Sequence, residues 1–285
     1  MTAGNVFDKI SHEYYYLTSA EKKVAGYVLD HQRETPFMSI TELAEESGVA
    51  EATVSRFCRR LDYPGYNAFK LAAADSAANH AAANPLAGEV LAEDSVGAMC
   101  QKIYAAHTDA LRETMEFIQP EQIARAADLL AAAGKVLCMG QGGSMILAEE
   151  AAHFFSTAMP KFFAVWDSHI QVMNASQMEP GDVVLYFSYS GATRELLECT
   201  RLVRAQGAKT ILITRFPRSP GASGADLVLQ CGSREGPIQL GSIAARIAQL
   251  YLIDVLFSEL SRRDIDGCRE RRGQVASALA EKHLG

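Results

Sequence analysis

The sequence predicts an all-α domain followed by an α/β domain, in which a five-stranded parallel sheet carries helices on both faces. Residues 39–62 have the pattern of two short helices joined by one tight turn. From Lys135 onward, short apolar runs alternate with helical stretches, and runs too apolar to leave one face wet indicate a sheet covered on both sides. At 285 residues the chain can bury two cores. We expect a first domain at 1–77, a helical linker at 78–120 and a second domain at 121–285.

The all-α domain is expected to begin with an amphipathic helix at 17–32, which leads into the helix pair at 39–62. Within the pair, Ser39 and Glu42 have the three-residue spacing of a reciprocal capping box. Gly48 can adopt the left-handed backbone that reverses the chain. These signals place a helix on each side of the turn.

The second helix of the pair is predicted to have an apolar and a polar face. The apolar face carries Val54, Phe57, Cys58 and Leu61 at helical spacing. The other face carries the predicted DNA contacts, namely Glu51, Thr53, Ser55, Arg56, Arg59 and Arg60. Arginine donates two hydrogen bonds to a base edge, and short side chains permit close approach. The pattern therefore predicts a helix-turn-helix that binds operator DNA, with an ordinary helical hairpin as the alternative.

The charge of the chain argues partly against DNA binding. The formal net charge is −7, whereas a DNA-binding domain usually has a basic face. Between positions 51 and 70 the balance is locally basic, since four cationic side chains outnumber Glu51 and Asp62. A basic patch of this size acts over a Debye length of roughly 8–10 Å. We therefore expect tight operator binding and weak non-specific binding.

The remaining elements follow from apolar periodicity and from turn residues. A helix is expected after Tyr66, followed by helices at 95–117 and 121–133. Five strands are expected at 136–139, 162–166, 183–187, 210–214 and 227–230. Helices are expected between or after them at 144–158, 168–178, 193–206 and 240–260, and the arginine-rich tail at 262–272 suggests a solvated helix.

Two loops of the α/β domain are suited to a phosphate. The first, residues 140–144, reads Gly-Gln-Gly-Gly-Ser and the second, residues 188–193, reads Ser-Tyr-Ser-Gly-Ala-Thr. Each follows a strand and opens a helix, where backbone amides and the helix dipole favour an anion. A dinucleotide fingerprint would need a third glycine at Met145, and neither loop contains a Walker Gly-Lys-Ser/Thr, so no nucleotide cofactor is expected. Plain helix capping by the serines is the alternative for either loop alone.

These motifs occur in an order that resembles the RpiR family of bacterial regulators. The order is a helix-turn-helix with Thr-Val-Ser-Arg-Phe-Cys-Arg-Arg-Leu at 53–61, then Gly-x-Gly-Gly-Ser, then Ser-x-Ser-Gly-x-Thr-x-Glu at 188–195. The second half is similar to a SIS (sugar isomerase) domain. The resemblance implies a regulator of carbohydrate metabolism whose operator binding responds to a phosphorylated sugar. By motif, the implied ligand contacts are Gly142, Gly143, Ser144, Ser188, Tyr189, Ser190, Gly191 and Thr193, with Asp167, His169, Glu235 and Ser242 near the sugar.

Catalysis is the second interpretation, because sugar-phosphate isomerases share the SIS fold. Isomerisation needs a base beside the substrate carbon, and the candidates are Glu149, Glu150, His153, His169 and Glu235. An isomerase has no evident use for a helix-turn-helix, so we rank the regulator first and a pure scaffold last. The seven histidines show no clustered metal-ligand spacing, so no metal is expected.

The assembly and the cellular setting are also expectations. Two-fold operators need two reading helices, so a homodimer or a tetramer is expected, and the apolar stretch 243–256 is a candidate subunit contact unless the monomer buries it. The sequence lacks a signal peptide and a bilayer-length apolar run, which predicts a cytoplasmic protein without a membrane partner. Six scattered cysteines predict reduced and mostly buried thiols.

Overall fold

The computed structural model describes residues 5–32, 34–83, 90, 92–233 and 242–280. By its internal contacts the chain forms two units, one of residues 1–108 with 234–242 and one of residues 109–233 with 243–285. The domain boundaries expected from the sequence stay predictions.

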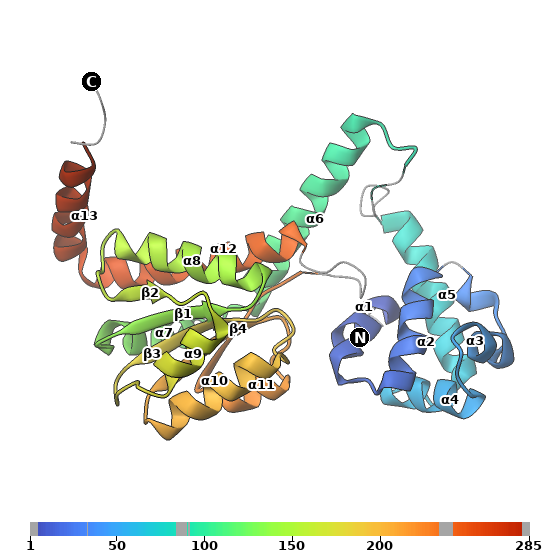
Figure 1. The fold of residues 1–285 in the computed structure, drawn as a ribbon. Helices are drawn as coiled ribbons and strands as arrows, with labels where there is room; N and C mark the ends of the chain where they lie inside the picture. The colour runs from blue at the N-terminus through green and yellow to red at the C-terminus, as the bar shows by residue number, and fades with distance from the viewer. Residues whose placement is uncertain (1–4, 33, 84–89, 91, 234–241, 281–285) are drawn as a thin grey trace. The chain divides into compact units, whose positions relative to one another are not determined.

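The first unit is all-helical, as predicted (Figure 1). Its helices are α1 (Val6–Glu13), α2 (Ser19–Asp30), α3 (Ile40–Glu46), α4 (Glu51–Arg60) and α5 (Tyr66–Ala83), with short 3-10 turns at Tyr14–Tyr16 and Thr35–Phe37. The sequence analysis did not predict α1. Its start is capped by the Asn5 side chain, which accepts a hydrogen bond from Phe7 N, and Val6 N donates to Ser76 Oγ of α5 at 2.9 Å. The second of these contacts joins α1 to α5.

The turn between α3 and α4 has the predicted geometry. Ser39 N donates to the Glu42 carboxylate at 2.6 Å, and Glu42 N donates to Ser39 Oγ at 3.1 Å, so the capping box is confirmed. These bonds, first the one from the Ser39 backbone, lower the pKa of Glu42 below its ordinary value. Gly48 has φ +63° and open space around its missing Cβ. Glycine is therefore needed there for backbone conformation and not for packing.

A small aromatic core holds the first unit together. Val54, Phe57, Cys58 and Leu61 are fully buried, which confirms the apolar face predicted for α4. The Phe57 ring meets the Phe69 ring of α5 edge to face at 5.7 Å between centroids. Because the buried members of this core all lie between Val6 and Ala73, it can form without the α/β unit.

The second unit contains the predicted five-stranded parallel sheet, in the order β2-β1-β3-β4-β5. The strands are β1 (Val136–Gly140), β2 (Phe162–Ala164), β3 (Val183–Phe187), β4 (Lys209–Thr214) and β5 (Leu227–Gln230). The helices are α6 (Val96–Phe117, which begins in the first unit), α7 (Pro120–Ala132), α8 (Gly143–Ser156), α9 (Ser168–Ala175), α10 (Arg194–Ala205), α11 (Pro220–Gly224), α12 (Ile243–Arg263) and α13 (Ile265–Ala280). The short α11 was not predicted.

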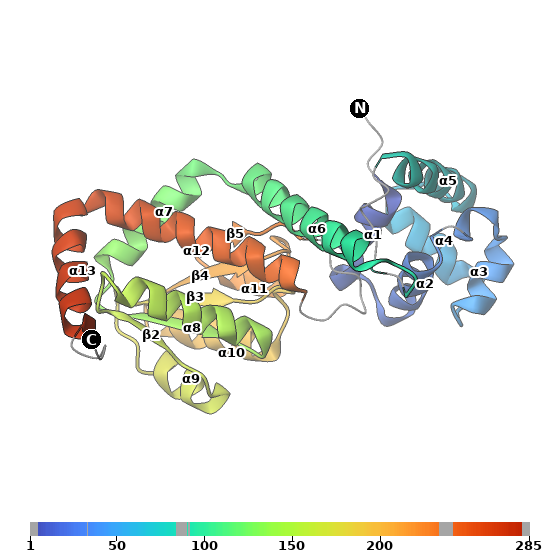
Figure 2. The same cartoon turned by 90° about the horizontal axis from the view of Figure 1, so that it is seen from above.

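Helices cover both faces of the sheet, as the apolar strands predict. Along β3, Val183, Leu185 and Phe187 join the core under α7, α8 and α12, whereas Val184 and Tyr186 join the core on the α9, α10 and α11 side. Figure 2 shows α7, α12 and α8 side by side over one face. Within 243–256, Leu252, Ile253 and Leu256 are buried in this core, whereas Ile243 and Leu250 are exposed. The stretch therefore serves the fold of the monomer in part, and its role as a subunit contact stays a prediction.

Most cysteine thiols are buried, as the sequence predicts. Five of the six cysteines are buried and only Cys100 is exposed. Burial raises the pKa of the Cys58 and Cys199 thiols to about 12, so both stay protonated at neutral pH. Within the described ranges, no helix is long and apolar enough to cross a membrane.

Candidate functional site

Both phosphate-suited loops begin at the same edge of the sheet. β1 and β3 are neighbouring parallel strands, and their last residues, Gly140 and Phe187, are partners in the register. In the strand order, β2 lies next to β1 and β4 lies next to β3, so the connections after β1 and β3 run toward opposite edges of the sheet. In open α/β sheets this point of divergence is where ligands bind, beyond the carboxyl ends of the strands.

The first loop, residues 140–144, turns so tightly that only glycine fits at its start. A Cβ on Gly140 would lie 2.7 Å from Ser144 O, and Gly142 caps α8 with φ +54°. Ser144 N donates to Gln141 O at 3.0 Å, which fixes the loop. Gly142 is exposed, and Gly143 and Ser144 are half-buried. The first turn of α8 is therefore only partly covered, and its Ser144 and Met145 amides already donate to Gln141 O and Gly142 O within the turn.

The second loop, residues 188–193, packs against α11 and its capping residue Ser219. Gly191 N donates to the buried Ser188 hydroxyl at 3.2 Å, and Gly191 O accepts from Gly221 N at 2.8 Å. Gly191 has φ +61°, and a Cβ there would lie 2.0 Å from Ser219 Oγ. Ser190 is half-buried, and its hydroxyl accepts from Ala192 N at 3.3 Å. The loop is thus built before any ligand arrives.

The two loops meet at Tyr186, near the end of β3. Burial, the larger effect, raises the pKa of the Tyr186 hydroxyl above its ordinary value, and the nearby side chains of Gln141 in the first loop and Thr193 in the second lower it by less. Thr193 Oγ1 is buried but has no well-aligned hydrogen-bond partner in the described part of the chain. The Tyr186 hydroxyl is likewise buried without a well-aligned partner among the described residues, so two polar groups near the loops are not paired by the protein itself.

A glutamine missed by the sequence analysis supports the first loop. Gln171 of α9 is 2% exposed, and its amide donates to Gly140 O at 3.1 Å and to Val165 O at 2.7 Å. Its carbonyl accepts from Gln141 Nε2 at 2.7 Å. Gln171 therefore holds the first loop against the segment after β2.

Arg246 of α12 was also missed. Its Nη2 lies 2.9 Å from the place a Cβ would take at Gly143, so the guanidinium lies directly against the first loop. The side chain is half-buried. A lone arginine about one hundred residues beyond the loop gives no local sequence signal, and only the packing of α12 brings it there. It adds a full positive charge to an anion site otherwise made of amides and hydroxyls.

The other predicted ligand residues differ in their surroundings. Asp167 is exposed and caps α9, because its carboxylate accepts from Ile170 N at 3.0 Å. His169 is exposed on the first turn of α9, and Ser242 is half-buried just before α12. Glu235 lies outside the described residues. The candidate bases Glu149, Glu150 and His153 are exposed on α8.

The predicted DNA-contacting side chains of α4 do not all share one surface. Arg56 and Arg59 are exposed, and Ser55 beside them is half-buried. Glu51 is exposed and accepts a hydrogen bond from Thr41 of α3. The placement of Thr53 on the outer face is wrong, since it is 6% exposed and its hydroxyl accepts from Arg56 at 3.2 Å.

Arg60 is exposed but holds the fold of the first unit. It donates to Tyr16 O and lies 3.6 Å from the carboxylate of Glu21, which is buried in the capping box of α2. The exposed cationic surface of α4 is therefore centred on Arg56 and Arg59.

Comparisons with known proteins agree with this architecture. Residues 4–80 match the helix-turn-helix domain of the rpiR family, and residues 129–259 match the SIS domain. The chain is 34% identical to the transcriptional regulator HexR of Pseudomonas aeruginosa, over 92% of this chain and 91% of that one. It is 32% identical to HexR of Escherichia coli, over 98% and 96%. A structure of Vibrio vulnificus NanR complexed with ManNAc-6P superposes with a TM-score of 0.64 at 24% identity, covering 99% of this chain and all of that one.

A helix-turn-helix domain followed by an α/β SIS domain defines the chain as a transcriptional regulator. The chain belongs to the RpiR family of helix-turn-helix regulators, whose second domain is a SIS domain.

Proposed function

We propose that this regulator binds operator DNA through α4 and binds a phosphorylated sugar on the two SIS loops, and that the sugar changes operator affinity. The observation that carries the proposal is that both loops leave the register-paired ends of β1 and β3, where the buried Tyr186 and Thr193 hydroxyls have no well-aligned partner within the described residues. A ligand can change operator affinity only if it binds two conformations of the protein unequally.

The chemistry of the loops favours a phosphate as the common group of the ligand. The hydroxyls of Ser144, Ser190 and Thr193 can donate to phosphate oxygens, and the first turns of α8 and α10 supply amides. Arg246 supplies the compensating charge. Asp167 and His169 would face the sugar, and so would Glu235 and Ser242. Because NanR is complexed with ManNAc-6P, N-acetylmannosamine 6-phosphate is a natural first probe for this chain.

We propose that the protein acts as a homodimer or a tetramer, and that it binds its ligand without turnover. Each chain offers one reading helix, and a two-fold operator presents two half-sites about 34 Å apart. The complete DNA-binding surface would then comprise two copies of α4, one from each chain of the dimer. The segment 78–120 is proposed as the linker between the domains at 1–77 and 121–285.

The ligand half of the proposal predicts that Ser190→Ala weakens phosphosugar binding about tenfold, because one hydrogen bond to a charged oxygen is worth about 1.5 kcal/mol. Calorimetric titration with N-acetylmannosamine 6-phosphate, glucosamine 6-phosphate and fructose 6-phosphate measures this. Ser156→Ala is the matched control, since Ser156 is exposed on α8 and bonds its own helix at His153 O. Equal affinity of the Ser190 variant and the control would remove the second loop from the site.

The DNA half predicts that Arg56→Ala weakens operator binding by about 1–3 kcal/mol if Arg56 contacts a base. The operator is first recovered by sequencing DNA fragments bound by the unaltered protein, and gel-shift titrations then compare the variants. Lys23→Ala makes the same charge change on an exposed position of α2 and should retain more affinity. If both variants bind alike, α4 is not the reading helix.

A further inference from the structure

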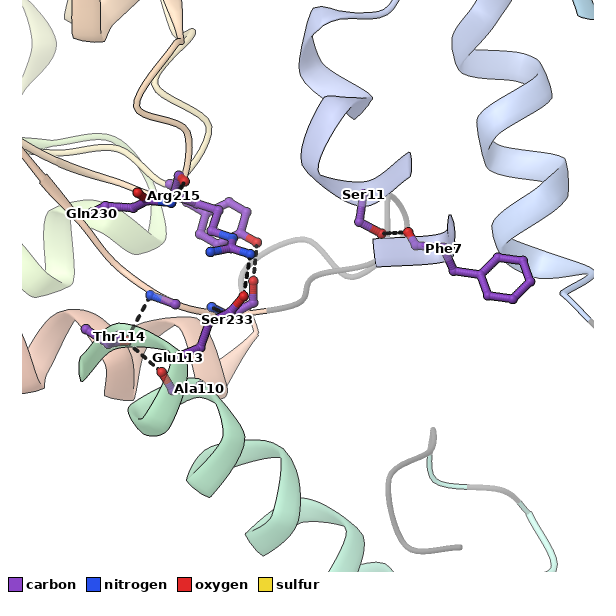
Figure 3. A network of polar contacts seen from close by, with 10 residues as sticks. Phe7, Ser11, Ala110, Glu113, Thr114, Arg215, Gln230 and Ser233 are labelled. Carbon is purple, nitrogen blue, oxygen red and sulfur yellow. Dashed lines mark hydrogen bonds and ion pairs between the residues drawn. The ribbon is translucent and has the colours of Figure 1, made fainter. Parts of the chain in front are cut away.

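Near its end, α6 is joined to Arg215, just after β4, by a partly buried ion pair and to Ser233, after β5, by a hydrogen bond (Figure 3). Arg215 Nη2, just after β4, lies 2.7 Å from Glu113 Oε1, and Glu113 Oε2 accepts from Ser233 N at 3.0 Å. The two side chains are 3% and 18% exposed for Arg215 and Glu113. Removing one partner from such a pair leaves a poorly solvated charge without its partner, so separating the two groups is costly.

The segment after β5 lies directly on the backbone of α6. Thr114 Oγ1 accepts from Gly232 N at 2.8 Å and donates to Ala110 O at 2.6 Å. A Cβ on Gly232 would lie 2.6 Å from Thr114 N. The Arg215 guanidinium also lies over the Phe117 ring, 5.0 Å from its centre. The contact is therefore close-packed as well as polar.

Arg215 and Ser233, which both bond to Glu113, also contact the second loop. Tyr189 O accepts from Arg215 N at 3.1 Å and from Thr214 Oγ1 at 3.0 Å. The Tyr189 hydroxyl donates to Ser233 O at 3.3 Å. Tyr189 stands between Ser188 and Ser190, so any shift of the loop displaces both partners of Glu113.

α6 continues beyond the α/β unit. It is one helix from Val96 to Phe117, and the division between the two units falls inside it, after residue 108. A helix is stiff over this length, so a displacement at Glu113 also moves the turns near Val96.

We propose that the Glu113–Arg215 pair, with Ser233 and Tyr189, couples the second loop to α6, so that occupation of the loop is transmitted along that helix toward the DNA-binding domain. This inference rests on the proposed function for the identity of the signal, but the coupling itself is a property of the ligand-free protein. Glu113 and Arg215 are positioning residues and do not touch the ligand.

Hydrogen exchange of the ligand-free, full-length protein tests the coupling. Glu113→Gln keeps the shape of the side chain and removes its charge, and amide exchange in residues 188–193 should rise about tenfold or more as the loop loses its support. Arg263→Gln is the matched control, because Arg263 joins α12 to α7 through Asp128 and does not contact the loop. In that variant residues 188–193 should exchange as in the unaltered protein.

The reverse perturbation completes the test. Tyr189→Phe removes the hydroxyl that donates to Ser233 O, and exchange of residues 110–118 should rise, since coupling acts in both directions. This variant also serves if Glu113→Gln fails to fold. The proposal is overturned if the folded Glu113→Gln variant shows unchanged exchange at 188–193 and the folded Tyr189→Phe variant shows unchanged exchange at 110–118. This holds whatever the titrations with phosphosugars show. Failure of every phosphosugar to change operator affinity in the unaltered protein would instead reject the proposed function and leave these exchange results valid.

Discussion

Replacing Gly191 by alanine should destabilise the α/β unit by about 2–5 kcal/mol, the sum of about 1–2 kcal/mol for a side chain in the left-handed region and about 1–3 kcal/mol for overpacking. Gly191 has φ +61°, and the new Cβ would lie 2.0 Å from Ser219 Oγ and 3.0 Å from Thr214 Oγ1. The second loop must then separate from α11, and phosphosugar binding should be lost with it. Denaturant unfolding and calorimetric titration measure the two effects.

Gly142 supplies a matched control for the steric part of this loss. It has φ +54°, but no heavy atom lies within 4 Å of the place its Cβ would take. Gly142→Ala should therefore destabilise by only about 1–2 kcal/mol, the conformational part alone. Equal losses for the two alanine variants would contradict the close packing of the second loop on α11.

Truncation of Phe57 to alanine should destabilise the all-helical unit by about 3–5 kcal/mol, because the ring is fully buried and leaves a cavity beside Phe69. A unit of this size has little stability in reserve, so operator binding should be lost. The α/β unit has separate cores and should unfold at an unchanged temperature. Differential scanning calorimetry should therefore show two transitions. The transition of the helical unit should move to a lower temperature than in the unaltered protein, and the transition of the α/β unit should stay at the same temperature.

Leu71→Ala is the control for this experiment. Leu71 lies on α5 in the same unit but is 74% exposed, so its truncation should leave both transitions and operator affinity nearly unchanged. If Phe57→Ala lowered the unfolding temperature of the whole protein in a single transition, the two units would not be independent.

The fold was largely predictable because each β-strand contains a short apolar run. The expected strands at 183–187 and 227–230 have the observed bounds, and the other three differ by one or two residues at an end. The two missed helices, α1 and α11, are short. Their stability comes from long-range contacts such as Val6 N to Ser76 Oγ and Gly221 N to Gly191 O, which no local pattern reveals.

The candidate site was predictable where one segment builds it. Each loop follows a strand and opens a helix, and that local setting was visible in its glycines and serines. Gln171 and Arg246 reach the first loop from distant helices, so they required the tertiary structure. The error at Thr53 has a simple cause. Thr53 precedes Phe57 by one helical turn and shares its buried face, whereas the prediction weighed the hydroxyl and not its position on the helix.

The distribution of thiols gives the native sequence a built-in attachment point. Among the six cysteines only Cys100 is exposed, and it lies on α6. A maleimide spin label or fluorophore added to the folded protein should modify that position first, since the thiolate of a buried cysteine is neither accessible nor readily formed. Movements of α6 between sugar-bound and sugar-free samples can then be followed by spectroscopy without engineering a single residue.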